Sequence, residues 1–212
     1  MSLIDKEIWY DWGGANDAIF SWVNSISGDI YDKAMLLLSS IGDHHNFYYY
    51  ITILAVVALL FYFVRKLSGR GGAPYLLAGW FGALIVLVAS YGAEGVILPA
   101  AKNYFAYPRP YMAATYEVRM LERKPSEDDY RSFPSGHAAF ITMMVVGLWP
   151  VLSKNMKIFG VLLIFGVCWS RLALGMHFPV DVLAGFLLSL VLVIIMRKII
   201  YWILLRLFKL KC

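Results

Sequence analysis

The chain has 212 residues, of which 60% are hydrophobic and 16% charged. A soluble domain is about 45–50% apolar and about 25% charged, so this composition argues against a soluble globular protein. The formal net charge of +5 is compatible with nucleic-acid binding. The basic residues, however, cluster beside apolar segments, which favours a membrane protein. We expect no nucleic-acid partner, and the sequence implies no protein partner.

Residues 1–47 form the first expected region, in which tryptophans and aliphatic side chains are mixed with aspartates and glutamates. The apolar spacing is helical, but the region is too polar for a good span. It predicts one or two amphipathic helices at the membrane surface, with a sixth, poor span as the alternative. The N-terminus has no basic segment followed by a short apolar one, so we expect no cleavable signal peptide.

Residues 48–212 form the second expected region, a single transmembrane domain. A spanning helix needs about 20 residues, most of them apolar. The sequence predicts an all-α integral membrane bundle of about five transmembrane helices. Their apolar segments are 48–64, 75–101, 138–152 (with a helix that starts earlier), 157–174 and 180–196.

The basic residues predict the orientation of this bundle. Ten of the nineteen lysines and arginines fall in loops or tails that a five-span count places on one side, which we expect to be cytoplasmic. The loop at 102–136 and the turn at 171–180 then face away from the cytoplasm. The 102–136 loop also carries six basic residues, which calls for another explanation. The ten are Arg65, Lys66, Arg70, Lys154, Lys157, Arg197, Lys198, Arg206, Lys209 and Lys211.

Three segments that carry reactive side chains, 102–110, 134–137 and 170–181, fall on this same outer face. Lys102, Arg109 and Arg171 converge there as three cations, and arginine in particular suits phosphate oxygens. An anionic ligand is their natural partner in a partly apolar site. The run from Pro134 to His137 precedes an apolar segment and so predicts a helix start, where backbone N–H groups favour an anion and Gly136 permits its close approach.

His177 and Asp181 are four residues apart. If a helix begins near Pro179, Asp181 lies in its first turn beside His177. A carboxylate bonded to one ring nitrogen leaves the other nitrogen of His177 free to attack phosphorus. His137, on another helix, is then the general acid for the leaving oxygen. Each residue also has a structural explanation on its own, such as an Arg171–Asp181 ion pair, but the joint pattern favours phosphoryl chemistry.

These motifs resemble the type 2 phosphatidic-acid phosphatase superfamily. Its pattern is a lysine, six residues and Arg-Pro, then Pro-Ser-Gly-His, then Ser-Arg, five residues, a histidine, three residues and an aspartate. The resemblance implies a phosphohistidine at His177, oriented by Asp181, with His137 as the acid. It also implies phosphate binding by the remaining motif residues, which are Lys102, Arg109, Ser135, Gly136 and Arg171.

From these observations we expect a membrane lipid phosphatase that needs no metal or cofactor. The expected substrates are bacterial envelope lipids: undecaprenyl pyrophosphate, phosphatidylglycerol phosphate, phosphatidate or a lipid A phosphate. The expected location is the bacterial cytoplasmic membrane, with the site on its outer face. The alternatives are a lipid-to-lipid phosphotransferase and a non-enzymatic protein that binds lipid phosphates. The sequence does not choose the lipid or the oligomeric state.

Three further features carry weaker expectations. Glu94 lies inside a span, so we expect it to face the bundle interior and pair with Lys102 or an arginine. The charged segment 117–131 is expected to be a solvated cap, with a role in gripping a headgroup as the alternative. His44 and His45 are not expected to bind a metal, on the reasoning that no carboxylate or cysteine stands at ligand spacing.

Overall fold

The computed structural model describes residues 9–69, 72–121 and 130–207. All regular secondary structure in these ranges is helical, as expected for an all-α protein. The elements are α2 (Ala15–Ser25), α3 (Asp29–Ile41), the 3-10 helix η1 (His44–Asn46), α4 (Phe47–Leu67), α5 (Ala73–Phe105), α6 (Pro110–Ala113), α7 (Gly136–Leu148), α8 (Lys154–Ala173) and α9 (Pro179–Leu207).

Four stretches are long and apolar enough to cross a membrane: His44–Leu67, Leu77–Ala113, Lys154–Ala173 and Pro179–Ile203. Together with the shorter apolar helix α7 they correspond to the five expected segments. In contrast, α2 has 11 residues and α3 has 13. At about 1.5 Å per residue neither crosses a hydrocarbon core of about 30 Å, so the described residues before α4 do not supply a sixth span.

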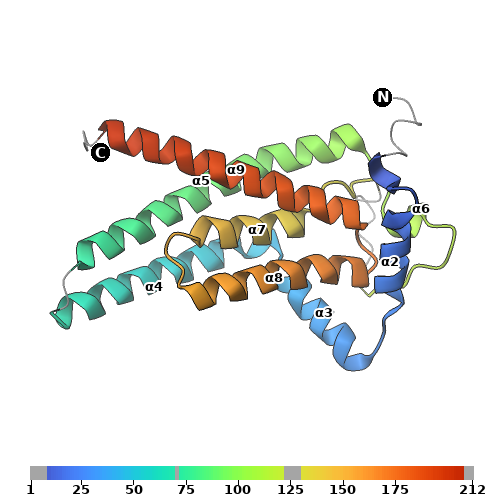
Figure 1. Cartoon of the computed structure of the whole chain (residues 1–212), viewed down its shortest axis with the longest axis horizontal. Helices are drawn as coiled ribbons and strands as arrows, with labels where there is room; N and C mark the ends of the chain where they lie inside the picture. Colours follow the sequence, from blue (N-terminus) through green and yellow to red (C-terminus); the bar gives the residue numbers. More distant parts are fainter. Residues whose placement is uncertain (1–8, 70–71, 122–129, 208–212) are drawn as a thin grey trace.

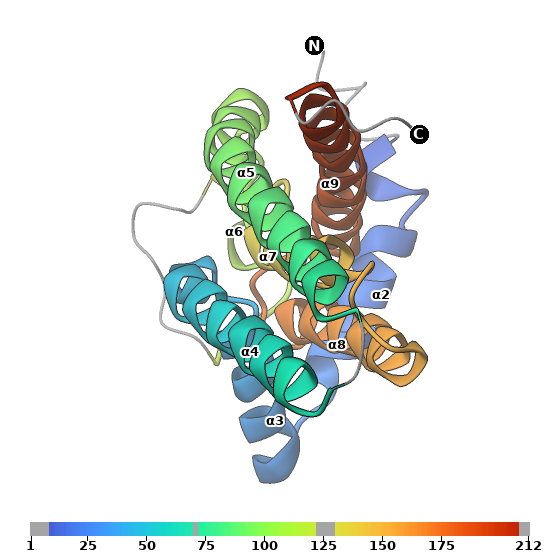
Figure 2. The same cartoon turned by 90° about the vertical axis from the view of Figure 1, so that its left-hand side faces the viewer.

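Helix α7 is the centre of the bundle. It packs against α9, α5 and α8, and Figure 2 shows it enclosed by these longer helices. Nine of its 13 residues are buried, which explains why it is apolar on all sides and not amphipathic. Because α7 is fixed on every side, the residues at its N-terminus have a rigid support.

The two ends of the bundle differ in chemistry. In Figure 1 the C-terminal ends of α4 and α9 and the start of α8, which carry the basic residues Arg65, Lys66, Lys154 and Arg206, lie at one end. The end of α5, the start of α7 and the α8–α9 turn lie at the other. All three motif segments therefore meet at the end opposite the basic helix termini.

Helices α2 and α3 cover this motif end (Figure 1). Helix α2 packs against α8 and α9, and α3 packs against α8. The side chain of Asn16 in α2 accepts a 3.0 Å hydrogen bond from the backbone N–H of Val180, in the first turn of α9. Phe20 and Val23 of α2 are fully buried in the same cluster as Phe178 and Val180. The N-terminal region is thus packed against the segment that carries His177 and Asp181.

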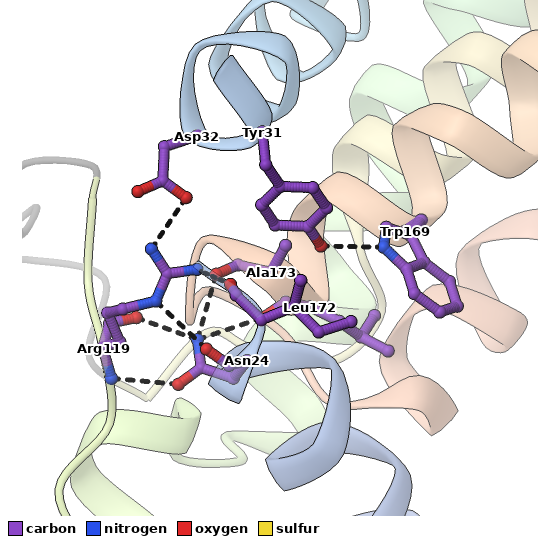
Figure 3. A network of polar contacts seen from close by, with 8 residues as sticks. Asn24, Tyr31, Asp32, Arg119, Trp169, Leu172 and Ala173 are labelled. Atoms are coloured by element: carbon purple, nitrogen blue, oxygen red, sulfur yellow. Dashed lines mark hydrogen bonds and ion pairs between the residues drawn. The ribbon is translucent and has the colours of Figure 1, made fainter. Parts of the chain in front are cut away.

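A polar network ties the loop after α6 to both N-terminal helices (Figure 3). The amide of Asn24 donates to the carbonyl oxygens of Arg119 and Ala173, and its oxygen accepts from the backbone N–H of Arg119. The guanidinium of Arg119 in turn forms a 2.8 Å ion pair with Asp32 in α3. Since Asn24 is 4% exposed, these bonds are shielded from water and hold the loop firmly against the end of α8.

Candidate active site

The turn between α8 and α9 follows from a glycine that ends α8. Gly175 has a φ of +77°, a left-handed conformation that glycine adopts readily. Its N–H bonds to the carbonyl oxygen of Leu172, and the N–H of Met176 bonds to that of Arg171. This is the Schellman pattern of helix termination, and it brings His177 back over the last turn of α8.

The start of α9 is also determined locally. The helix begins at Pro179, the favoured first position, as the sequence analysis expected. Asp181 is the third helical residue, and its Oδ2 atom accepts a 2.9 Å hydrogen bond from the N–H of Phe178. An acidic side chain that reaches back in this way caps the helix N-terminus. Capping therefore fixes the carboxylate close to His177.

The carboxylate of Asp181 receives two further hydrogen bonds from side chains. The hydroxyl of Ser132 donates to Oδ2 at 2.5 Å, and that of Tyr10 donates to Oδ1 at 2.8 Å. The Nδ1 atom of His177 lies 3.6 Å from Oδ2 and 3.5 Å from the Ser132 oxygen. The Nδ1 atom of His177 thus faces Asp181 and Ser132, and Nε2 is the second ring nitrogen, on the other side of the imidazole.

His177 is 2% exposed and is surrounded by positive charge. Burial, and then the charges of Arg109, Arg171, Lys102 and His137, lower the pKa of His177 well below its usual value. The ring is therefore neutral near pH 7, which is the form with a lone pair available for attack. These charges act on His177 because the four residues lie near its ring.

Two of the three cations are buried and held by residues far away in the sequence. Arg171, 2% exposed, donates from its Nη1 atom to the hydroxyl of Ser39 in α3. Arg109, 4% exposed, donates to the carbonyl oxygen of Met176 at 3.2 Å. Lys102 lies in the last turn of α5. The guanidinium groups are fixed in position by these contacts before any anion arrives.

The motif segment 134–137 lies at the start of α7. Ser135 is the N-cap residue, and its side chain accepts from the N–H of Ala138 while its own N–H donates to the carbonyl oxygen of Asp181 at 2.9 Å. A Cβ atom added to Gly185 of α9 would lie 2.3 Å from the oxygen of Ser135, so this glycine permits the close approach of α9. A Cβ atom on Gly136 would meet no described atom within 4 Å, which leaves space beside the first amides of α7.

A cavity of about 540 Å³ reaches the site between η1, α5 and α7. Its wall includes the motif residues Lys102 and Gly136, together with Glu94, Gly95, Arg131 and Phe140. The α5 residues in this wall extend from Tyr91 to Lys102, which corresponds to about 16 Å along a helix. The cavity is therefore long enough for the part of a lipid that adjoins its phosphate.

Two of the weaker expectations concern residues in this wall. Glu94 is 3% exposed, as expected for an ionisable residue inside a span. The hydrogen bond described for it comes from Ser189 of α9 at 2.5 Å, whereas the sequence suggested Lys102 or an arginine. Of the charged segment 117–131, residues 122–129 lie outside the described ranges. Its described start belongs to the Arg119 network.

The sequence analysis found no carboxylate near His44 and His45. This was wrong, because Asp43 directly precedes them. The Oδ1 atom of Asp43 lies 2.8 Å from Nδ1 of His45 and 3.6 Å from Nδ1 of His44. The potential ligand atoms of the three residues lie within 4.8 Å of one another. Asp43 also caps η1, since it accepts from the N–H of His45 at 2.9 Å. Capping explains the grouping, and the absence of a metal stays a prediction.

The sequence analysis missed three residues that contact the expected site: Tyr10, Ser39 and Ser132. Ser132 lies next to the Pro134–His137 segment and so had a signal in its position. Tyr10 and Ser39 lie in the N-terminal region and had none, because their partners are 171 and 132 residues away.

A family model described as the PAP2 superfamily matches residues 81–204. This is more than half of the chain and includes all three motif segments. The chain belongs to the PAP2 superfamily. The match begins within α5, so the helices that cover the motif end, α2 and α3, lie outside the region that defines this PAP2 protein's family.

One curated relative is an undecaprenyl-diphosphatase from Sulfolobus acidocaldarius, 38% identical over 107 residues. The match covers 50% of this PAP2 chain and 49% of the relative, so the chain spans about half the length of the curated relative it matches. The match supports membership of the same family. The activity given in the relative's name is a property of that relative.

Two solved structures have the same fold. One is LpxE from Aquifex aeolicus, with a TM-score of 0.67 and 22% identity, covering 87% of this chain and 95% of that one. The other is a transmembrane PAP2 type phosphatidylglycerolphosphate phosphatase from Bacillus subtilis, with a TM-score of 0.66 and 22% identity, covering 88% of this chain and 85% of that one. The fold of this chain is therefore that of transmembrane PAP2 proteins, and the protein is an integral membrane protein.

Proposed function

We propose that this protein is a lipid phosphatase that hydrolyses a phosphate monoester or pyrophosphate of a membrane lipid. One observation carries the proposal: a buried, neutral His177 has Nδ1 against Asp181 and Ser132 and lies among the charges of Lys102, Arg109 and Arg171. This arrangement suits attack on a phosphorus atom whose oxygens are held by cations. Family membership supports it independently.

In the proposed reaction the Nε2 atom of His177 attacks phosphorus, a P–N bond forms, and the P–O bond to the lipid breaks. His137, which takes up a proton as the negatively charged phosphate binds beside it, donates that proton to the departing oxygen as general acid. The guanidinium groups of Arg109 and Arg171, with Lys102, bind the oxygens of the phosphoryl group as it is transferred. The hydroxyl of Ser135 and the first amides of α7, at Gly136, complete the phosphate site.

Hydrolysis of the phosphohistidine completes the cycle. Water attacks phosphorus as His137, now unprotonated, accepts its proton, and the P–N bond breaks to give inorganic phosphate and neutral His177. Asp181 keeps the imidazole in one orientation throughout, because its carboxylate is fixed by the N–H of Phe178. No proton or electron is left over, so no cofactor is needed for the balance.

The lipid is proposed to enter the site sideways from the bilayer. Its phosphate lies at the motif end of the bundle, and the adjoining alcohol occupies the cavity along α5. The acyl or prenyl tails remain in the membrane. Residues 1–47, in this proposal, lie at the membrane surface, where exposed apolar side chains such as Ile19, Trp22 and Leu37 contact lipid. Residues 48–212 form the transmembrane phosphatase domain.

The proposed location is the bacterial cytoplasmic membrane, with the site on the extracytoplasmic face. The separation of the basic helix ends from the motif segments (Figure 1) supports this orientation. The candidate substrates are those of the outer leaflet and of the envelope: undecaprenyl pyrophosphate, phosphatidylglycerol phosphate, phosphatidate and lipid A phosphates.

The test is phosphate release by detergent-purified protein from these four lipids, with His177→Ala as the control. Release from at least one lipid by the wild type, and none by the variant, supports the proposal. Transfer of the phosphoryl group to an added lipid acceptor without release of phosphate identifies a phosphotransferase instead. Tight lipid binding without either reaction indicates a non-enzymatic binding protein.

A further inference from the structure

The residues that hold Asp181 are not all in the family motifs. Three groups donate hydrogen bonds to its carboxylate: the N–H of Phe178, the hydroxyl of Ser132 and the hydroxyl of Tyr10. The first two lie within the region matched by the PAP2 family model, residues 81–204. Tyr10 lies before α2 and outside that region, and it alone among the three bonds to Oδ1.

Tyr10 is held in place by a cluster of aromatic rings. Its ring centroid is 4.3 Å from that of Tyr107 and 6.0 Å from that of Phe178, which adjoins His177. Trp9 packs edge-on against Phe133 at 5.3 Å. Aromatic pairs at these separations stabilise one another, so the phenol is directed at Asp181 by packing and not only by its hydrogen bond.

The hydroxyl of Tyr10 is a dependable donor. Burial, followed by the nearby Asp181 carboxylate, raises the pKa of Tyr10 well above its usual value. The phenol therefore stays protonated over the whole working range of pH and remains able to donate to the carboxylate.

The two oxygens of Asp181 have different tasks in this geometry. Oδ2 faces His177 and accepts from Ser132 and Phe178, whereas Oδ1 accepts from Tyr10. If Oδ1 had no donor, rotation of the carboxyl group would bring Oδ1 toward the ring and would exchange the positions of the two oxygens. A donor on Oδ1 opposes that rotation and also stabilises the ionised form.

We propose that Tyr10 is a positioning residue of the active site, which fixes Asp181 and through it the attacking nitrogen of His177. This inference rests on the proposed phosphatase function. It gives the N-terminal segment a role in the chemistry, whereas the family motifs alone describe a site made by α5, α7, α8 and α9.

Tyr10→Phe tests the proposal, because it removes the hydroxyl and keeps the ring. We expect kcat to fall about tenfold for the best lipid substrate, with KM changed by less than about twofold, since a hydrogen bond to a charged group is lost at a distance from the substrate. Tyr31→Phe is the matched control. It removes a phenol of α3 that lies away from Asp181 and accepts a 2.9 Å hydrogen bond from Trp169. The kcat of this variant should be unchanged.

A pH profile separates positioning from mere packing. Losing a donor to the ionised carboxylate makes protonation of the His177–Asp181 pair easier, so the acid limb of kcat should move to higher pH in Tyr10→Phe. Among the described residues, the groups that also act on Asp181 or Tyr10 include Arg109, Tyr107 and His177, and all three are retained in the variant. Trp9→Phe, which alters the same aromatic cluster, should leave the limb in place.

The outcomes are distinct. Wild-type kcat and an unmoved acid limb in a folded Tyr10→Phe protein would overturn the inference, and so would equal losses in Tyr10→Phe and Trp9→Phe. If the wild type itself releases no phosphate from any lipid or from p-nitrophenyl phosphate, the proposed function fails and the role of Tyr10 fails with it, whereas an active wild type with an unaffected Tyr10→Phe variant overturns the role of Tyr10 alone. Thermal unfolding in detergent, measured for each variant, shows whether it is folded at the assay temperature.

Discussion

The Nδ1 atom of His177 and the Oδ2 atom of Asp181 lie 3.6 Å apart, and the hydroxyl of Ser132 is within 3.5 Å of both. The hydroxyl of Ser132 therefore bridges the two side chains, which also face each other directly. In the proposed reaction Nε2 is therefore the attacking nitrogen, because Nδ1 faces the side chains that orient the ring.

The first prediction concerns the two histidines. His177→Ala should abolish phosphate release, because the P–N bond cannot form, while the protein remains folded. His137→Ala should slow release from lipids by about 10²–10⁴-fold, the usual contribution of a general acid, with a smaller loss for p-nitrophenyl phosphate, whose leaving group needs no proton. Steady-state release of phosphate measures both. Wild-type rates in His177→Ala would exclude it as the nucleophile.

A second prediction concerns the metal requirement of the reaction. Three cations and two histidines meet the needs of phosphoryl transfer, so activity should survive excess EDTA. Vanadate, which becomes five-coordinate like phosphorus during transfer, should inhibit by binding among Lys102, Arg109 and Arg171. Activity that disappears with EDTA and returns only with added magnesium would contradict the mechanism. His45→Ala tests whether the group formed by Asp43, His44 and His45 takes part in such a dependence on metal.

The cavity along α5 leads to a third prediction. A Cβ atom on Gly95 would meet no described atom within 4 Å, so a leucine there should be accepted by the fold and fill the cavity. Gly95→Leu should raise KM for a lipid substrate at least about tenfold and leave p-nitrophenyl phosphate hydrolysis near the wild-type rate, because a small ester does not need the cavity.

Gly95→Ala is the matched control, and its effect on the lipid should be small. Equal losses for the lipid and the small ester in Gly95→Leu would mean that the substitution disturbs the phosphate site, and the cavity would no longer be a candidate for the lipid alcohol.

A fourth prediction concerns the turn that presents His177. Gly175 has a φ of +77°, and a Cβ atom there would lie 2.6 Å from the carbonyl oxygen of Arg119. Gly175→Ala should destabilise the protein by at least about 1–2 kcal/mol, the strain of a left-handed alanine, with a further loss from the clash. Thermal unfolding in detergent measures it. Gly92→Ala, in a helix and with no atom within 4 Å, should be neutral or stabilising.

The fifth prediction tests orientation. In a background with Cys168→Ser and Cys212→Ser, a cysteine at the exposed Thr115, at the motif end, should react with an impermeant thiol reagent in intact cells. A cysteine at the exposed Asn155, at the start of α8, should not. The reverse pattern would put the chemistry in the cytoplasm and favour phospholipids of the inner leaflet as substrates.

The fold was largely predictable because its signals are local. Long apolar runs mark the helices, and Pro179 with Asp181 marks the start of α9, which the structure places at that proline. The family match includes the motif segments that the sequence analysis selected. Their roles in catalysis, which depend on a bound substrate, stay predictions.

The contacts that hold the site were not predictable because they join distant segments. Apolar periodicity says that α3 has a buried face, but it does not say that Ser39 meets Arg171. The same holds for Glu94, whose charge predicted an ionic partner, whereas packing of α5 against α9 brings Ser189 to it. Helix pairing, which periodicity leaves open, decides such contacts.

The hydrogen bond between Tyr10 and Asp181 joins residues 171 positions apart, and the Asn16–Val180 bond is almost as long-range. During synthesis the N-terminal helices therefore emerge long before their partners and must wait for α9 to insert. Before α9 is made, the growing chain already has Lys102, Arg109 and the first amides of α7, but it lacks Asp181, the group proposed to orient His177. In the proposed mechanism, a chain that stops before α9 should therefore be unable to modify lipids during its own assembly, because its His177 has no carboxylate to orient it.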